Sequence, residues 1–370
     1  MRFPEFTGEW MKCKFGEIAT GFDYGMNAAA KPYDGQNKYI RITDIDEVSS
    51  TYNNSSIVSP DGILSENYVV NEGDILLART GASTGKSYLY RKSDGKLYYA
   101  GFLIRANVAK HNPYFVFSQL HTHRYWRWVS IMSARSGQPG INSLEYASFP
   151  IFTTTLKEEN NISSLLSLID KRIATQNKII EDLKKLKSAI RKMIFTSLKN
   201  EHTENREINQ LLAYEQPSEY IVTNDEYSAD TTLTPVLTAN KGFVLGYTNE
   251  NFGIYKKGEC IIFDDFTMDA KYVSFPFKVK SSAIKILTAK PNVNLRFMFE
   301  YLSYLELKSE EHKRHYISEI ASLIIELPSK EKQNRIAYLM TSLDNKLALE
   351  ENTMARYMDE KQYILLQMFI

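Results

Sequence analysis

The 370-residue chain is 43% hydrophobic and 24% charged, a composition typical of a globular protein long enough for two domains with separate cores. Its two cysteines, Cys13 and Cys260, lie far apart and in no metal-binding motif, so the sequence indicates neither a disulfide framework nor a metal site. The first residues carry no signal-peptide pattern, and no stretch approaches the roughly 18 to 20 apolar residues of a membrane helix. We therefore expect a cytoplasmic protein without membrane association.

The first part of the chain, residues 1–156, is predicted to be a mixed α/β domain. Short runs rich in Tyr, Ile, Val and Phe between Gly, Asn and Asp indicate strands at residues 39–42, 75–78, 96–99 and 102–105. A single helix is expected at residues 113–129. Between residues 75 and 144, ten Lys and Arg residues accompany one acid, Asp94. Most charge runs are solvated faces, but this bias also suits contact with phosphates.

Residues 157–202 are predicted to form a long helix that ends in a polar linker. Pro150 ends the extended segment before it, because proline does not fit inside a helix. The apolar positions then recur at alternating steps of four and three residues, the 3.5-residue period of a coiled coil. These seam positions include Ile162, Leu166, Ile169, Ile173, Leu183 and Ile190. A helix of about 40 residues spans roughly 60 Å.

Residues 203–328 are predicted to form a second mixed domain. Strands are expected at residues 261–263 and 283–287, and a helix is expected at residues 295–307. A second acid-free stretch, residues 270–299, holds six Lys and Arg residues at the corresponding place in the chain. Two basic stretches at matching positions favour a shared surface role.

Residues 329–370 are predicted to form a second long helix that repeats the first at a fixed offset of 174 residues. Its seam positions include Ile336, Leu343, Leu347, Met354 and Ile364. The polar seam positions recur as Gln176/Glu350 and Lys187/Lys361, and Asp170/Asp344 and Phe195/Phe369 also match. Because one apolar stripe needs a partner in water, we expect the two helices to pack against each other.

Weaker matches extend the repeat into the domains. Residues 15–18 correspond to residues 208–211 at an offset of 193, and residues 73–77 correspond to residues 258–262 at 185. The predicted fold class is therefore α+β: two mixed α/β domains, separated by two long antiparallel coiled-coil helices, in a pseudo-two-fold internal repeat.

Taken together, the motifs resemble those of the specificity subunits of type I restriction-modification systems, over nearly the whole chain. The resemblance rests on the order of RFPEFTGEW at the start, GDILLARTG at 73–81, TPVLTANKGF at 234–243, IIFDDFT at 261–267 and HKRHYIS at 312–318. It implies that each domain reads one half of a bipartite, asymmetric site in double-stranded DNA and that the helices set the spacing. It also implies two modification subunits that carry S-adenosylmethionine and methylate adenine, with restriction subunits in some complexes. The chain itself is expected to hold no cofactor and no catalytic centre.

The candidate DNA-contacting residues are polar or charged side chains near turns. In the first domain they are Arg79, Thr80, Ser83, Thr84, Lys86, Arg105, Arg135, Ser136 and Gln138. In the second domain they are Asp265, Thr267, Lys271, Lys313, Arg314 and His315. Arginine can pair with guanine, and aspartate can accept from cytosine. For Asp264 and Asp265, a hydrogen bond within a turn or at a strand end is the alternative.

Three other functions can be considered for this sequence. Residues 81–87 resemble a P-loop, but only three residues separate the glycines and a strand-like segment follows, so the interpretation fails. The Asn112-Pro113-Tyr114-Phe115 segment resembles the site of amino-methyltransferases but lacks the second proline, which favours a loop that enters a helix. The remaining alternative is a coiled-coil scaffold that assembles other subunits without reading DNA.

Overall fold

The computed structural model describes residues 2–47, 49–134, 139–201, 203–239, 242–307 and 316–369. The chain forms two compact units: unit 1 comprises residues 1–177 and 352–370, and unit 2 comprises residues 178–351. The sequence predicts long helices in the segments that begin at residues 157 and 329. Each compact unit includes part of both helices.

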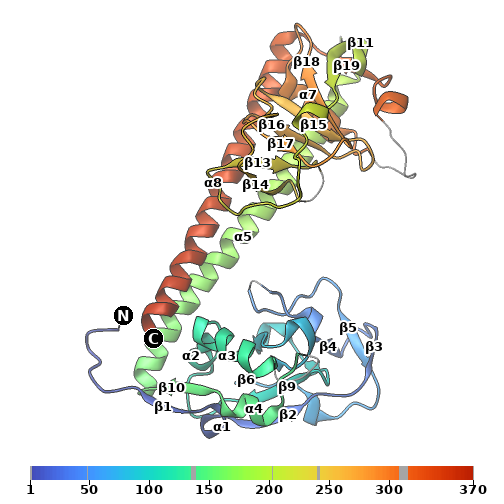
Figure 1. Ribbon diagram of the computed structural model, residues 1–370. Helices are drawn as coiled ribbons and strands as arrows, with labels where there is room; N and C mark the ends of the chain where they lie inside the picture. Colours follow the sequence, from blue (N-terminus) through green and yellow to red (C-terminus); the bar gives the residue numbers. More distant parts are fainter. Residues whose placement is uncertain are drawn as a thin grey trace. The chain divides into compact units, whose positions relative to one another are not determined.

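Unit 1 is built on a four-stranded antiparallel sheet with the order β2–β9–β6–β7 (Figure 1). The strands are β2 (Thr20–Tyr24), β9 (Leu103–Asn107), β6 (Asp74–Ala78) and β7 (Ser87–Leu89). Strand β6 is buried along its whole length because it has apolar neighbours on both faces. Ile75 and Leu77 belong to one apolar cluster, and Leu76 and Ala78 belong to another. A continuous apolar run, rather than an alternating one, is what a strand buried on both faces requires.

The other strands of unit 1 pair two by two. They are β1 (Met11–Lys14) with β10 (Pro150–Thr153), β3 (Ala29–Pro32) with β5 (Val58–Asp61), and β4 (Lys38–Ile40) with β8 (Leu97–Tyr99). Only the last of these pairs is parallel. The predicted strands in this part overlap β4, β6, β8 and β9.

The single helix predicted at residues 113–129 is wrong, because two helices occupy this segment. The helices of this part are α1 (Phe15–Ile18), α2 (Pro113–Gln119), α3 (His123–Ser133) and α4 (Ser143–Ser148). Thr122 separates α2 from α3: its hydroxyl donates to the Gln119 carbonyl at 2.8 Å and accepts from the Tyr125 amide at 3.3 Å. A side chain that caps a new helix ends the previous one. Asn112 caps α2 in the same way, so the Asn-Pro segment is a helix start, as expected.

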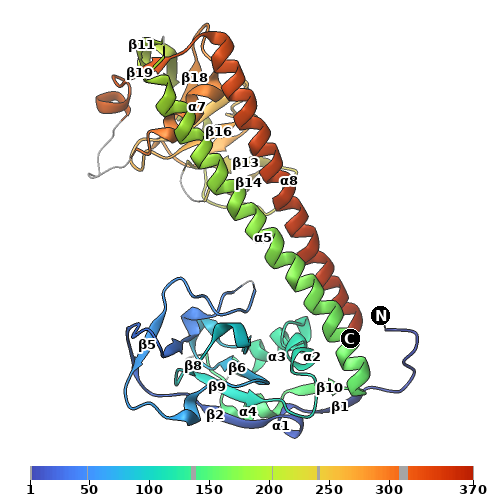
Figure 2. The ribbon, with the colours of Figure 1, turned by 180° about the vertical axis from the view of Figure 1, so that it is seen from behind.

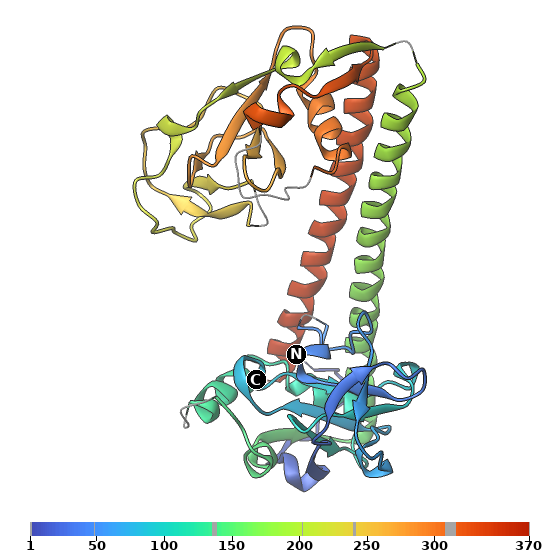
Figure 3. The same cartoon turned by 90° about the vertical axis from the view of Figure 1, so that its right-hand side faces the viewer.

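Unit 2 carries an equivalent sheet with the order β12–β18–β15–β16. Its strands are drawn in yellow-green to orange in Figure 3. The strands are β12 (Leu212–Glu215), β18 (Ile284–Ala289), β15 (Cys260–Asp264) and β16 (Ala270–Val273). Smaller sheets are formed by β14 (Val244–Thr248), β13 (Thr234–Leu237) and β17 (Lys278–Val279), and by β11 (Glu204–Glu207) with β19 (Ile324–Leu327). The helical segments are α6 (Ile208–Leu211), α7 (Leu295–Tyr304) and a π-helical turn at Tyr316–Ile320.

The two units therefore repeat one topology. In each unit, the first strand pairs with the strand that precedes a long helix. A four-residue helix comes directly after that first strand. The four-stranded sheets of the two units have equivalent strand orders. Helices α1 and α6 stand at the predicted offset of 193 residues. Short 3-10 turns complete the structure at Ile42–Asp44, Glu66–Tyr68, Gly81–Ser83, Lys92–Asp94 and Ser218–Tyr220.

The long helices are α5 (Leu156–Leu198), with 43 residues, and α8 (Lys330–Met368), with 39. Within each unit they lie side by side, α5 in green and α8 in red (Figure 2). In unit 1 they share an apolar core with α2, and in unit 2 they share one with α7. The seam positions Ile162, Leu166, Ile169, Ile336, Leu347 and Ile364 are buried, and Ile173, Leu183, Ile190, Leu343 and Met354 are half-buried.

The polar seam residues form equivalent ion pairs between the helices. In unit 2 the Lys187 ammonium lies 2.5 Å from the Asp344 carboxylate, and in unit 1 the Lys361 ammonium lies 2.7 Å from Asp170. Both partners of the second pair are displaced by 174 residues from those of the first. The sequence repeat thus corresponds to a repeated contact.

Candidate nucleic-acid interface

Five of the predicted residues of the first domain lie at one end of the unit 1 sheet: Arg79, Thr80, Ser83, Thr84 and Lys86. In the strand register, Ala78 at the end of β6 pairs with Leu103, the first residue of β9, and Leu77 pairs with Ser87, the first residue of β7. The segment from Arg79 to Lys86 connects β6 to β7, so its side chains all emerge at this end. Tyr24, the last residue of β2, lies there too. This region consists of Tyr24, Phe102 and residues 79–86, and we call it the unit 1 sheet end.

Arg79 is held at the sheet end by its backbone and by an aromatic ring. Its amide donates to the Phe102 carbonyl at 3.1 Å, and its guanidinium lies 4.6 Å from the centre of the Tyr24 ring. The Tyr24 hydroxyl accepts a hydrogen bond from the Ser143 amide at 3.3 Å. Hydrogen bonding with the side chain and the backbone of Ser143, together with the charge of Arg79, lowers the pKa of Tyr24. The result is a planar cation stacked on a ring that is itself fixed in place.

The glycine-rich turn after Arg79 is held by hydrogen bonds within the protein. The Gly81 amide donates to the Pro139 carbonyl, the Thr84 hydroxyl donates to the Gly81 carbonyl at 2.7 Å, and the Tyr125 hydroxyl donates to the Gly85 carbonyl at 2.8 Å. Gly85 has a φ of +94°, and a Cβ there would lie 2.7 Å from Val129. Strand β7, not a helix, follows. This is the structure of a tight β-connection rather than a phosphate-binding loop.

Several predicted residues of unit 1 are engaged inside the protein. Thr84 is buried, and the Lys86 ammonium forms an ion pair with Glu47. The Arg105 guanidinium donates to the carbonyls of Asn67 at 3.0 Å and Val69 at 3.2 Å, and it also pairs with Asp23. These contacts give Thr84 and Arg105 structural roles. Thr80 and Ser83 are half-buried at the sheet end. Arg135, Ser136 and Gln138 lie outside the described residues.

The equivalent end of the unit 2 sheet has the opposite chemistry. The Asp265 amide donates to the Ala283 carbonyl at 2.8 Å, the same backbone position that Arg79 and Phe102 hold in unit 1. The Asp265 side chain is 1% exposed, accepts a hydrogen bond from the Tyr316 amide at 2.8 Å and lies 3.4 Å from the Lys285 ammonium. A carboxylate buried in this way cannot reach a base, so the assignment of Asp265 as a DNA contact is corrected to an internal ion pair.

The remaining unit 2 candidates are only partly placed. Thr267 is exposed, and its hydroxyl donates to Asp269 at 3.1 Å. Asp264 accepts the amides of Phe266 and Thr267 at 2.9 Å each, which is the turn hydrogen bonding that was the alternative for this residue. Lys271 is half-buried on β16. Lys313, Arg314 and His315 lie outside the described residues.

Three of the six cations in the second basic stretch are paired with acids inside unit 2, so the expected surface role is corrected for these three. The buried Lys278 ammonium lies 2.5 Å from Glu250 and donates to the Phe252 carbonyl. Lys285 pairs with Asp265, and Arg296 pairs with Glu300 at 2.6 Å. Glu250 and Asp265 lie outside the basic stretch, and Glu300 lies one residue beyond its end, so a count within the stretch does not detect these acids.

Sequence reasoning missed two residues of the unit 1 sheet end. Phe102 is 62% exposed and Tyr24 is 41% exposed, which is unusual for large aromatic side chains beside a buried sheet. Phe102 was assigned to a strand, but β9 begins one residue later. Only the turn at Gly101 hints that this side chain lies outside the sheet.

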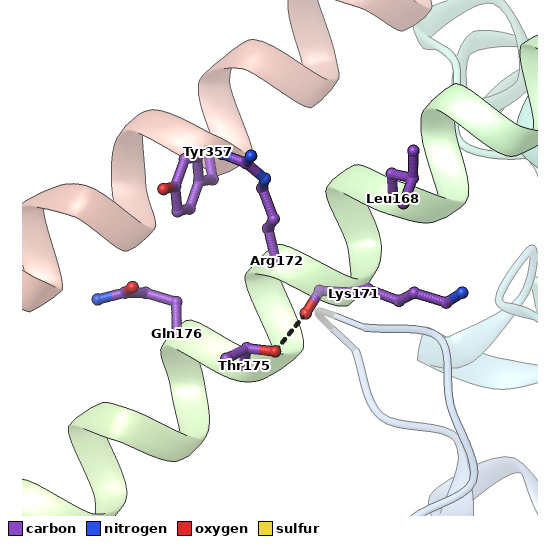
Figure 4. A pocket seen from close by; sticks show the side chains of 6 residues that line it. All are labelled: Leu168, Lys171, Arg172, Thr175, Gln176 and Tyr357. Carbon is purple, nitrogen blue, oxygen red and sulfur yellow. Dashed lines mark hydrogen bonds between the residues drawn. The ribbon is translucent and has the colours of Figure 1, made fainter.

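Two open hollows lie along the long helices. One hollow of about 310 Å³ lies on α5 and α8 of unit 1 and is lined by Leu168, Lys171, Arg172, Thr175, Gln176 and Tyr357 (Figure 4). Another, of about 440 Å³, lies at the start of α8 in unit 2. Within the described ranges, no group of His, Cys, Asp and Glu residues could hold a metal ion, and no helix is long and apolar enough to cross a membrane.

Comparison with known proteins gives a consistent result. Residues 199–356 match the family model of the type I restriction modification DNA specificity domain. A type I restriction enzyme specificity subunit from Escherichia coli is 39% identical over 167 residues, which are 42% of this chain and 41% of that subunit. One from Methanocaldococcus jannaschii is 24% identical over 325 residues, 79% of this chain and 76% of that one. The chain is therefore similar to type I specificity subunits, and its match to the family model covers residues 199–356.

Solved structures of the specificity-subunit family share the fold. The crystal structure of the type I restriction-modification S subunit from M. genitalium matches with a TM-score of 0.62 at 14% identity and covers 96% of this chain and 95% of that one. A chain from a structure of a type I restriction-modification system matches with a TM-score of 0.54 at 14% identity, covering 96% of each chain. The match to the E. coli subunit covers less than half of that relative, in keeping with domains that diverge within the family.

Proposed function

We propose that this chain is the DNA-reading subunit of a type I restriction-modification complex and that it has no catalytic centre of its own. The observation that carries the proposal is the repeated backbone position at the sheet end, which holds Arg79 in unit 1 and, in unit 2, Asp265, a residue paired internally with Lys285. One fold appears twice with different chemistry at the same sheet end. That arrangement suits two readers of different half-sites in one asymmetric duplex site.

The partners follow from the same proposal. Two modification subunits, each holding S-adenosylmethionine, would methylate adenine, and restriction subunits would join for cleavage, all in the cytoplasm. Support comes from large apolar side chains that remain exposed on the long helices: Leu168, Tyr363 and Leu366 in unit 1, and Ile179, Leu186, Met193, Tyr338 and Leu349 in unit 2. Exposed apolar positions on both helices, in both units, are typical of a surface that binds other subunits.

The DNA-reading role is tested by binding of the full chain, assembled with its modification subunits, to duplex DNA. A reader binds a defined site more tightly than random duplex, and its affinity falls steeply as salt rises from 50 to 200 mM, because phosphate contacts release counterions. Sequencing of methylated adenines then gives the site. Binding that is neither salt-sensitive nor sequence-dependent would instead support the scaffold alternative.

The docking role is tested separately with Leu186→Glu and Met193→Glu in one chain. Both side chains are exposed on α5, so the substitutions should leave the fold intact and weaken the association with modification subunits. Ser188→Glu, also exposed on α5, is the matched control. Assembly that is unchanged on size-exclusion chromatography with light scattering would show that this part of α5 is not a docking surface.

A further inference from the structure

Phe102 is presented to solvent by a rigid turn. The Gly101 amide donates to the Met26 carbonyl and the Leu103 amide to the Ala100 carbonyl, both at 2.8 Å. A Cβ on Gly25 would lie 2.2 Å from the Ala100 carbonyl oxygen, so the backbones approach as closely as glycine permits. The backbone on both sides of the exposed Phe102 is thus held by hydrogen bonds within the protein.

Arg79 stands directly beside this ring. Its amide hydrogen bond to the Phe102 carbonyl, 3.1 Å long, places the two residues on neighbouring backbone segments. Its guanidinium is stacked on Tyr24 and forms no ion pair with any residue that the structure describes. An oriented cation and an exposed apolar ring therefore emerge side by side, about 5 Å apart at the backbone, as for adjacent strands.

We infer that Arg79 and Phe102 read two adjacent base pairs in the major groove, with Arg79 on a guanine and Phe102 on the 5-methyl group of a thymine. This inference rests on the proposed DNA-reading function and deepens it. In the major groove, guanine offers the O6 and N7 acceptors that suit a guanidinium, and thymine offers a methyl group that suits an apolar side chain. The spacing of about 5 Å between the two backbone segments is of the same order as the 3.4 Å rise between base pairs, so the two side chains can reach neighbouring base pairs.

Comparison of the two units supports a role of Arg79 and Phe102 in reading DNA sequence rather than in maintaining the fold. At the equivalent backbone positions, unit 2 has Asp265 and Ala283, which supply neither a free cation nor an aromatic ring. The backbone frame is common to both units, so the fold does not require the pair. Side chains that differ between two copies of one frame are expected where each copy reads its own sequence.

The test uses the full chain in complex with its modification subunits and a pool of random duplexes, from which bound DNA is sequenced. The wild-type complex should select a bipartite motif. Phe102→Ala should lose the preference for one thymine, and Arg79→Ala for the neighbouring guanine, each by about 5- to 100-fold at that position alone. Phe102→Leu keeps an apolar contact and should retain part of the preference. Leu156→Ala, another exposed apolar side chain of unit 1 (53% exposed), is the control and should leave the motif unchanged.

A second measurement isolates the methyl group. Replacing the selected thymine by deoxyuridine removes only the methyl, so it should weaken binding by the wild type and not by Phe102→Ala. The inference is overturned if Phe102→Ala selects the wild-type motif, if it weakens all duplexes equally, or if deoxyuridine has no effect on the wild type. If the wild-type complex selects no motif at all, the proposed function fails rather than this inference. Thermal unfolding of each variant confirms that the fold is retained.

Discussion

At the residue scale, Glu300 of α7 lies fully buried between cations from two helices. Its carboxylate accepts hydrogen bonds from Arg191 at 2.8 Å and Arg296 at 2.6 Å, and the Lys187 ammonium lies 3.7 Å away. Asp344 of α8 also pairs with Lys187 and Arg296, so two acids share three cations at the point where α5, α7 and α8 meet. Removing one partner of a buried ion pair is costly, because the remaining charges stay desolvated.

We therefore expect Glu300→Ala to lower the free energy of unfolding by about 3 to 5 kcal/mol. Urea unfolding, followed by circular dichroism, measures the change. Glu351→Ala is the matched control, because Glu351 forms an ion pair with Lys184 in which both side chains are more than half exposed. That pair should contribute about 1 kcal/mol or less. Equal effects of the two substitutions would show that the buried network does not stabilise the protein.

His121 of unit 1 provides a pH-dependent contribution to stability. Its ring packs on Phe117, and its two nitrogens lie 3.0 Å from the Phe117 carbonyl and 3.0 Å from the Ser50 hydroxyl. Burial, together with the nearby charge of Lys361, lowers the pKa of His121 from 6.5 to about 4. The neutral ring is therefore the form that the folded protein favours.

Proton binding determines the direction in which the free energy of unfolding changes with pH. Between pH 6.5 and 4 the unfolded chain takes up a proton at this position and the folded chain does not, so stability present above pH 6.5 is lost as the pH falls. The loss should be at most about 3 kcal/mol. His121→Gln should show a smaller difference in the free energy of unfolding between pH 7.5 and 4.5 than the wild type. The same difference in both proteins would rule out this role.

At the element scale, the ion pairs between α5 and α8 fix the alignment of the two helices within each unit. Asp170 and Lys361 are both about one-fifth exposed, and Asp170 also accepts a hydrogen bond from the Tyr114 hydroxyl. Polar groups at a coiled-coil seam favour one register over others. The same arrangement recurs as Lys187 with Asp344.

A double-mutant cycle with Asp170→Asn and Lys361→Met tests this coupling. Each single variant leaves a partly desolvated charge without its partner, so the double variant should be more stable than the sum of the two effects predicts. We expect a coupling energy of about 0.5 to 2 kcal/mol in urea unfolding. Additive effects would show that the two residues lie close together without stabilising each other.

The sequence was sufficient to predict the elements that repeat a regular period. The seam of α5 and α8 could be followed because each position is three or four residues from the next, and β6 could be found from its continuous apolar run. The break between α2 and α3 was missed because it depends on one side chain, Thr122, which acts as a cap rather than as an interruption of the pattern. A helix period alone does not reveal such a cap.

The candidate site was harder to predict, because it depends on contacts between distant residues. Lys278 and Asp265 carried charges that suited DNA, yet each is neutralised by a residue from another segment, Glu250 and Lys285. Phe102 was overlooked because an exposed and a buried phenylalanine look the same in a sequence. Arg79 was found because it follows a buried strand directly, where a turn must bring the chain to the surface.

At the scale of the whole molecule, both long helices continue from one unit into the other, so their length is part of the proposed reading function. Removing residues 176–182 from α5 and residues 350–356 from α8 deletes one heptad from each at the common offset of 174 and keeps the seam in phase. Each helix becomes shorter by about 10.5 Å, roughly the length of three base pairs.

The shortened protein should methylate sites with the same two half-site sequences and a shorter spacer between them. Sequencing of methylated adenines after expression with the modification subunits measures both quantities. A control with conservative substitutions in the same heptads should keep the original spacer. Unchanged spacing, or altered half-site sequences, would contradict the proposed separation between reading and spacing.

Unit 1 is built from segments at both ends of the sequence, and this affects how the protein folds during synthesis. Its core joins Trp10 and Phe115 to Phe369, whose ring lies 5.6 Å and 5.3 Å from theirs. These residues flank the whole of unit 2 in the order of translation, since residues 352–370 follow residues 178–351. A ribosome therefore releases the segments of unit 2 before it has supplied the last pieces of unit 1. The first domain to emerge is therefore the last whose core can be completed, and until then the apolar surface that Phe369 covers stays open to solvent.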